Sequence, residues 1–288
     1  MALNPTADPA GAPHRATFVL STGRCGTQWL AAALASAAGT GARVEHEPLR
    51  DRYQPRRMLG LRDPAELGDR LAAPILAHAA AIERELADRD YVETGHPCWS
   101  SLPWLVRRLE GRVRVVHLVR HPVPTACSWL SHGLFAPPLL PHQRMKEFIA
   151  PTDAGVSFPE YQTCWSELAP VEKGLVYWAE VNAFGLRQER ALGVPWLRIH
   201  YEALFDPASE ALARLAAFVG LPAERIRQID RGERVDEHRF HLAAWPEPER
   251  IARHPPVIAV AEALGYRAEA FAPAALAARF FGAEDAQP

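Results

Sequence analysis

At 288 residues the chain can form one large domain or two small ones, and its 48% of hydrophobic residues is ordinary for a globular protein. Its 32 Lys and Arg nearly balance its 34 Asp and Glu, which argues against nucleic acid or an anionic membrane surface as a partner. We find no apolar run of the roughly 18 residues that a membrane span needs, no secretory signal and no CxxC pair among four cysteines, so we expect a cytoplasmic protein.

The first predicted element is residues 17–34, which begin with the β-branched and aromatic pattern of a short buried strand. A turn with Gly23 and Gly26 follows, and Thr27 begins a run with helical spacing. This order directs backbone N–H groups and the positive end of a helix dipole at an anion, and Arg24 adds a permanent charge. The stretch predicts a phosphate-binding loop, although two glycines are also common in an ordinary strand–helix connection.

Two better-known loops do not fit this stretch. A Walker A loop needs a Lys after its last glycine, and no Lys follows Gly26. A cysteine phosphatase loop, CxxxxxR, would need an Arg six residues after Cys25, where Ala31 stands.

The next segments alternate between strand and helix patterns. TGARVEHEP (40–48) predicts a second short strand, and the Arg- and Pro-rich residues 49–65 predict a loop. Residues 66–88 predict a helix, YVETGHPCWSSLP (91–103) predicts a strand leaving into a turn, and WLVRRLEG (104–111) predicts a short helix.

The strongest strand pattern is RVRVVHLVRHP (112–122), which is β-branched, mostly apolar and ends at Arg120. We expect Pro122 and Pro124 to shape a loop, and Ser128 to lie in the first turn of the helix that follows. An Arg and a Ser near a helix start form a compact anion site. Alternatively, Arg120 pairs with a surface acid and Ser128 only begins the helix.

The second half of the chain opens with a Pro-rich insertion at residues 131–160, for which we consider the role of a substrate lid. Helix, strand, helix and helix patterns follow at 165–192, 194–204, 208–219 and 256–265. Five aromatic residues could line an apolar acceptor cleft or belong to the core: Phe135, Phe148, Phe158, Tyr161 and Trp165.

Strands alternate with helices throughout, which predicts an α/β fold of three layers with a mainly parallel central sheet flanked by helices. We expect a disordered tail at residues 1–14, rich in Ala, Pro and Gly, and a single domain over residues 15–282.

Two segments carry a resemblance to a known family. GRCGTQW (23–29) resembles the 5′-phosphosulfate loop of sulfotransferases that use 3′-phosphoadenosine 5′-phosphosulfate (PAPS), and departs from it at Gly23, Cys25 and Gln28. VVHLVRHPVPTACSWL (115–130) resembles the 3′-phosphate loop of the same family, with Arg120, Pro122 and Ser128 at the matching spacing. IHYEALFDP (199–207) is similar to a strand-ending segment whose Tyr lies near the adenine.

The resemblance implies a P-loop NTPase-like sulfotransferase fold, PAPS as co-substrate and no metal. The residues that it implies for binding PAPS are Arg24, Cys25, Gly26, Thr27, Gln28, Trp29, Arg120, Ser128, Tyr201 and Arg239. Among these, Trp29 would stack on the base, and Arg239 is the nearest substitute for the family's late Arg-Lys-Gly loop, which this sequence does not reproduce.

Sulfuryl transfer also requires a base that removes the acceptor's proton. Glu47 lies where some carbohydrate and tyrosyl-protein sulfotransferases use a Glu, and His96 lies within one residue of the catalytic His of cytosolic sulfotransferases. We favour Glu47, keep His96 as the alternative, and assign the stabilisation of developing charge to Arg24.

We therefore expect transfer from PAPS to a hydroxyl, or less readily an amine, of a small-molecule or carbohydrate acceptor. The alternatives are a P-loop kinase of small molecules and a non-catalytic nucleotide-binding protein of the same fold. The oligomeric state cannot be predicted from the sequence.

Overall fold

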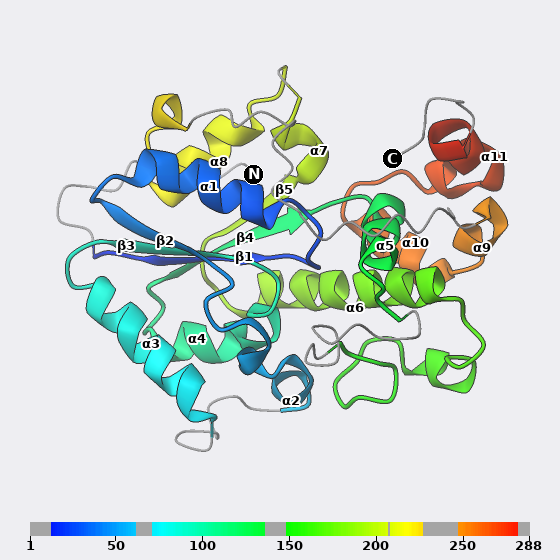
Figure 1. Ribbon diagram of the computed structural model, residues 1–288, viewed down its shortest axis with the longest axis horizontal. Helices are drawn as coiled ribbons and strands as arrows, with labels where there is room; N and C mark the ends of the chain where they lie inside the picture. The colour runs from blue at the N-terminus through cyan, green and yellow to red at the C-terminus, as the bar shows by residue number, and fades with distance from the viewer. Residues whose placement is uncertain (1–12, 62–70, 136–147, 207, 227–246, 282–288) are drawn as a thin grey trace. The chain divides into compact units, whose positions relative to one another are not determined.

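The computed structural model describes residues 13–61, 71–135, 148–206, 208–226 and 247–281 (Figure 1). The chain forms two compact units, of which the first is Met1–Val119 with Gly185–Val235 and the second is Arg120–Phe184 with Asp236–Pro288. Most of the predicted N-terminal tail lies outside the described residues.

The first unit contains a five-stranded parallel sheet. Its strands are β1 (Ala16–Leu20), β2 (Ala42–His46), β3 (Asp90–Thr94), β4 (Val113–Val119) and β5 (Trp196–His200). They lie in the order β2-β3-β1-β4-β5, and each neighbouring pair is parallel. The predicted α/β fold with a parallel central sheet is confirmed.

Helices cover both faces of this sheet and complete three layers. The helices that lie wholly in the first unit are α1 (Thr27–Ala38), α2 (Pro55–Leu59), α3 (Ala73–Glu85), α4 (Leu102–Arg108), α7 (Tyr201–Leu204) and α8 (Ala211–Val219). In Figure 1, α1 and α8 lie over one face of the sheet, and α3 and α4 lie under the other. The strands β1 and β4 are buried along their whole length because both of their faces are covered.

The core of this unit follows from the helical periodicity of its sequence. On α1, Leu30, Ala33, Leu34 and Ala37 are buried at the spacing of one helical face. They pack in one apolar cluster with strand residues such as Val116. This packing fixes the start of α1, and with it the loop that precedes the helix.

The second unit is helical in the residues that the structure describes. Its helices are α5 (Pro122–Ser131), most of α6 (Pro170–Ala191), α9 (Pro248–Ala252), α10 (Pro255–Ala263) and α11 (Pro273–Leu276). Glu172 on α6 is fully buried and forms ion pairs with Arg250 and Arg253 and a hydrogen bond with His254. This carboxylate therefore ties α6 to the segment that carries α9.

Two local predictions were wrong. Residues 49–65, predicted as loop, contain a 3₁₀ helix at Arg50–Tyr53 and the helix α2. The helix α5 begins at Pro122, so Ser128 lies in its second turn rather than its first. Both errors come from reading proline as a loop residue, whereas proline is well tolerated in the first turn of a helix.

None of the described helices is both long and apolar enough to cross a membrane.

Candidate active site

The loop after β1 contains three residues in the left-handed region of the backbone. Gly23, Arg24 and Gly26 all have positive φ angles, of 74°, 57° and 76°. Gly26 is the N-cap of α1, and in the described residues no side chain caps this helix start. The first-turn N–H groups of α1 are therefore available to an anion such as a phosphate.

The side chain of Cys25 stabilises this loop through contacts with its backbone and with Thr22. It is buried, and its Sγ donates to the carbonyl oxygen of Gly23 at 3.2 Å and lies 3.2 Å from the Thr22 hydroxyl. The Ser21 hydroxyl accepts a hydrogen bond from the N–H of Gly23 at 3.1 Å. Any role of Cys25 in binding a ligand is consequently limited to its backbone N–H.

An aromatic group stands beside the same loop. The ring of Tyr201 lies so close to Gly26 that a Cβ at this position would come within 2.7 Å of it. Phe205 contacts the rings of both Tyr201 and Trp29, with centroids 4.8 Å and 4.6 Å apart. Phe205 thus links the rings of Trp29 and Tyr201, and the role of these two residues in binding adenine stays a prediction.

Sequence reasoning missed Phe205. Its position in the sequence could have indicated it, because Phe205 follows Tyr201 by four residues and this spacing places both rings on one side of a helical turn. The sequence placed Tyr201 at the end of a strand, whereas β5 ends at His200 and Tyr201 begins α7.

The two candidate bases form one hydrogen-bonded pair. Nδ1 of His96 lies 3.0 Å from Oε1 of Glu47, and His46 Nε2 lies 4.0 Å from the same oxygen. The Glu47 side chain is 23% exposed and that of His96 is 9% exposed, so Glu47 is the more accessible member. Burial lowers the pKa of His46, partly offset by the charge of Glu47.

Gly95 makes this pair possible. Its φ of 137° is unfavourable for other residues, and a Cβ here would lie 2.3 Å from Cγ of Glu47. The N–H of Glu47 donates to the carbonyl oxygen of Thr94 at 2.9 Å. Glu47 is therefore held against the last residue of β3 and the glycine that follows it.

The pair and the phosphate loop occupy neighbouring strand ends. Glu47 follows β2, His96 follows β3 and Arg24 follows β1, and β3 lies between β2 and β1 in the sheet. Because all these strands are parallel and adjacent strands are about 4.8 Å apart, these carboxyl ends lie along one edge. The loop of residues 23–26 and the Glu47–His96 pair thus follow the carboxyl ends of three neighbouring strands.

Comparison with solved structures identifies the fold. A sulfotransferase domain from the curacin biosynthetic pathway superposes with a TM-score of 0.52 at 15% identity, covering 89% of this chain and 99% of the other. A sulfotransferase from Alicyclobacillus acidocaldarius gives 0.50 at 14% identity, covering 90% and 99%. The chain has the sulfotransferase fold. In sequence comparisons, no family model matches the chain and no curated protein matches it significantly.

The second segment that resembles the sulfotransferase family begins in β4 and continues into the helical unit, which includes Arg120 and Ser128. Arg120 is the first residue after β4, and its carbonyl oxygen accepts a hydrogen bond from Nε1 of Trp178 at 2.9 Å. Ser128 lies on α5 and is partly exposed. Their assignment to the 3′-phosphate stays a prediction, and Arg239 lies outside the described residues.

Four of the five aromatic residues predicted to line an acceptor cleft form ring contacts in the described part of the chain. Phe148 and Trp165 each contact the ring of Phe135. Tyr161 instead contacts His254. No cluster of three or more His, Cys, Asp or Glu that could hold a metal ion occurs in the described part of the chain.

Proposed function

We propose that the chain transfers a sulfuryl group from PAPS to a hydroxyl, or less readily an amine, of a small-molecule or carbohydrate acceptor. The observation that carries this proposal is the Glu47–His96 pair at the strand end beside the loop of Gly23–Gly26. A phosphate-binding loop alone would fit many nucleotide-binding proteins. A carboxylate–imidazole pair beside it adds the proton acceptor that transfer to a hydroxyl needs.

The loop fits a phosphosulfate in its shape. Gly26 has a positive φ and no side chain, so the Tyr201 ring can lie against it, and the first N–H groups of α1 follow directly after it. These N–H groups and Arg24 would hold the bridging phosphate and stabilise the charge that develops on it as the S–O bond breaks. The rings of Trp29, Phe205 and Tyr201 offer apolar surface for the adenine.

In the proposed reaction, the proton of the acceptor hydroxyl is transferred at the carboxyl end of β2, where Glu47 lies. Glu47 accepts the proton of the acceptor hydroxyl while the acceptor oxygen forms its bond to sulfur, and adenosine 3′,5′-bisphosphate (PAP) leaves. The Nδ1–H of His96 donates to Oε1 of Glu47 and orients the carboxylate. A positioned base of this kind typically contributes 10²–10⁴-fold to the rate. We assign the proton to Glu47 because its side chain is the more exposed of the two.

A ligand comparison tests the co-substrate. We expect PAP to raise the melting temperature, with or without EDTA, and at about 100 times its Kd to add roughly 2.7 kcal/mol of stability. A shift that occurs only with ATP and magnesium would support a small-molecule kinase and overturn the proposal.

Turnover of labelled PAPS against a panel of hydroxyl and amine acceptors tests the chemistry. Glu47→Gln should lower kcat by about 10²-fold or more, with PAP binding unchanged. Glu45→Gln, two residues earlier on β2, is the matched control and should retain activity. Loss of activity in His96→Gln but not in Glu47→Gln would transfer the role of base to His96. Binding of PAP without turnover of any acceptor would favour a non-catalytic nucleotide-binding protein.

A further inference from the structure

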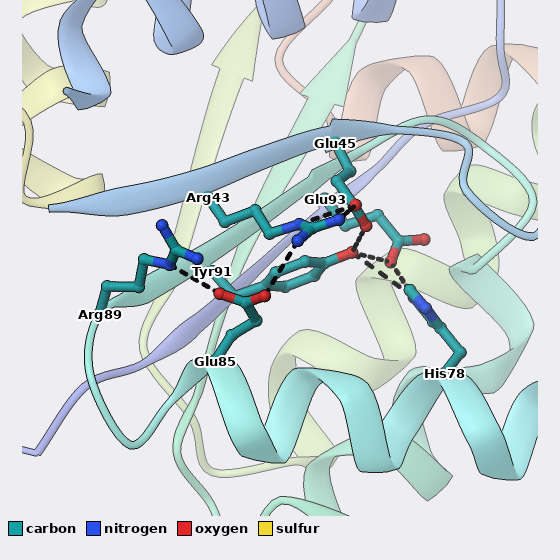
Figure 2. A network of polar contacts seen from close by, with 7 residues as sticks. All are labelled: Arg43, Glu45, His78, Glu85, Arg89, Tyr91 and Glu93. Carbon is teal, nitrogen blue, oxygen red and sulfur yellow. Dashed lines mark hydrogen bonds and ion pairs between the residues drawn. The ribbon is translucent and has the colours of Figure 1, made fainter. Parts of the chain in front are cut away.

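A buried carboxylate lies just behind the candidate active site. Glu93 on β3 is 1% exposed, and its oxygens accept from the Tyr53 hydroxyl at 2.7 Å and the Tyr91 hydroxyl at 3.2 Å. His78 Nε2 on α3 lies 2.9 Å from the same carboxylate. Figure 2 shows His78 from α3 and the Tyr91 hydroxyl from β3 beside the Glu93 carboxylate, with Glu45 from β2 on the other side of the Tyr91 hydroxyl. A buried carboxylate needs such donors, since unpaired burial would be costly.

The two tyrosines are neutral donors to this carboxylate. Burial, together with the charge of Glu93, raises the pKa of both Tyr53 and Tyr91 well above the ordinary value. The Tyr91 hydroxyl also donates to Glu45 at 2.8 Å. The two hydroxyls differ in where they come from: Tyr91 is on the same strand as Glu93, whereas Tyr53 comes from the turn that follows Glu47.

That turn is under backbone strain. Glu47, Arg50 and Gln54 have φ angles of 45°, 49° and 52°, in the left-handed region that non-glycine residues rarely adopt. Such a conformation persists only where surrounding contacts hold it. Tyr53 is fully buried within this turn, and its hydroxyl reaches Glu93.

Both ends of the strained turn are therefore attached to consecutive residues of one strand. At its start, the N–H of Glu47 donates to the Thr94 carbonyl oxygen. At its end, the Tyr53 hydroxyl donates to Glu93. The same strand continues through Gly95 to His96, the partner of Glu47.

We propose that Tyr53, through its hydrogen bond to Glu93, is a positioning residue that holds the turn of residues 47–54 so that Glu47 stays paired with His96. The inference rests on the proposed function, because it assigns Glu47 a task in the reaction. The hydrogen bond between Tyr53 and Glu93 is buried, so Tyr53 acts through Glu47 and not by contact with the co-substrate or the acceptor.

The test compares two variants that each remove one hydroxyl from the same carboxylate. Tyr53→Phe releases the turn, while Tyr91→Phe leaves the attachment of the turn intact and serves as the matched control. In Tyr53→Phe we expect kcat to fall by about 10- to 100-fold, because a misplacement of about 1 Å can have an effect of this size. The KM for PAPS and the melting shift with PAP should stay at their wild-type values. In Tyr91→Phe, kcat should stay within about twofold of wild type, a difference that corresponds to well under 1 kcal/mol.

Hydrogen exchange supplies a readout that needs no activity. Amide exchange in peptides covering residues 47–54 should be faster in Tyr53→Phe and unchanged in Tyr91→Phe, because only the first variant frees this turn to open locally. Peptides of α1 report global stability and should exchange alike in both variants.

The outcomes separate the two proposals. If wild type transfers sulfate and both variants have the same kcat, the positioning role is overturned and the proposed function stands. Faster exchange of the turn without a loss of kcat also overturns the positioning role. Absence of transfer by the wild-type chain overturns the proposed function and this inference with it.

Discussion

Gly26 shows how a single residue determines the conformation of the loop that we propose binds phosphate. It combines a φ of 76° with the Tyr201 ring against its Cα, so an added methyl group meets both backbone strain and a collision. Gly193 has a similar φ of 64° but open space around the position of a Cβ. The two glycines therefore separate the effect of strain from the effect of crowding.

We predict that Gly193→Ala lowers the free energy of unfolding by about 1–2 kcal/mol, the typical cost of a left-handed conformation. Gly26→Ala should lower the free energy of unfolding by about 1 kcal/mol more, because the added methyl group also collides with the Tyr201 ring. It should also abolish the melting shift with PAP. Chemical denaturation and PAP titration of both variants measure this. Equal destabilisation, with PAP binding retained in Gly26→Ala, would contradict the role that we assign to the loop.

The sequence supplied candidates for the site but not the contacts between them. The resemblance to sulfotransferases suggests Glu47 and His96 as rival bases. That they form one hydrogen-bonded pair depends on the pairing of β2 with β3 and on the conformation of Gly95, neither of which local patterns reveal. Phe205 and Tyr53 were missed for the same reason, since their importance comes from what they touch in the fold.

At the scale of elements, α5 begins with a histidine cap that the sequence did not indicate. Nδ1 of His121 accepts a hydrogen bond from the N–H of Val123 at 3.2 Å, and its ring stacks on Phe271. Burial, with the charges of Arg279 and Arg120, lowers the pKa of His121 to about 3. A protonated imidazole could not accept this hydrogen bond, so the cap requires the neutral ring.

The pH dependence follows from this lowered pKa. In the unfolded chain His121 takes up a proton near pH 6.5, and in the folded chain only near pH 3. Its contribution to stability is therefore complete above about pH 6.5 and decreases as the pH falls towards 3. We predict that His121→Asn, which keeps a capping side chain but cannot titrate, makes the free energy of unfolding less dependent on pH in this window. Urea denaturation between pH 4 and about 7 measures the slope. An unchanged slope in the variant would show that His121 does not titrate as described.

The segment that the sequence predicted as a lid contains a firmly attached part. The carboxylate of Glu180 on α6 is buried and accepts hydrogen bonds from the N–H groups of Ser157 and Phe158, both at 2.7 Å. Residues 136–147 lie outside the described part. Any movement of the insertion would therefore have to leave residues 157–158 in place or break two charge-assisted hydrogen bonds.

At the scale of the whole molecule, the alternation of strands and helices was sufficient to predict the fold class. It predicts a parallel sheet because parallel strands require helical crossovers between them. It could not predict the strand order β2-β3-β1-β4-β5, which places the end of β1 next to the end of β3. That order arises from contacts between distant segments, and it is what brings the loop beside the Glu47–His96 pair.

Binding of one nucleotide by two segments that are distant in the sequence, the loop of Arg24 and the segment of Arg120 and Ser128, is also a prediction about the whole molecule. The spacing of Arg120 and Ser128 predicts a site for the 3′-phosphate, whereas the loop of Arg24 is predicted to bind the 5′-phosphate group. Ligands that differ only in the 3′-phosphate can separate these roles. PAP carries both phosphates, and adenosine 5′-monophosphate carries only the one at the 5′ position.

We predict that Arg120→Ala weakens the binding of PAP by about 10- to 100-fold, as expected for a charge-assisted hydrogen bond of about 1.5–3 kcal/mol, and leaves the binding of adenosine 5′-monophosphate unchanged. Arg24→Ala should weaken both ligands by similar factors, because both contain the 5′-phosphate. Isothermal titration of the two ligands against wild type and both variants completes the comparison. If Arg120→Ala weakened both ligands equally, or neither, the assignment of the 3′-phosphate to Arg120 would fail while the role of Arg24 stood on its own result. A selective loss of PAP binding would place the 3′-phosphate at Arg120 by function, independently of the resemblance from which the assignment came.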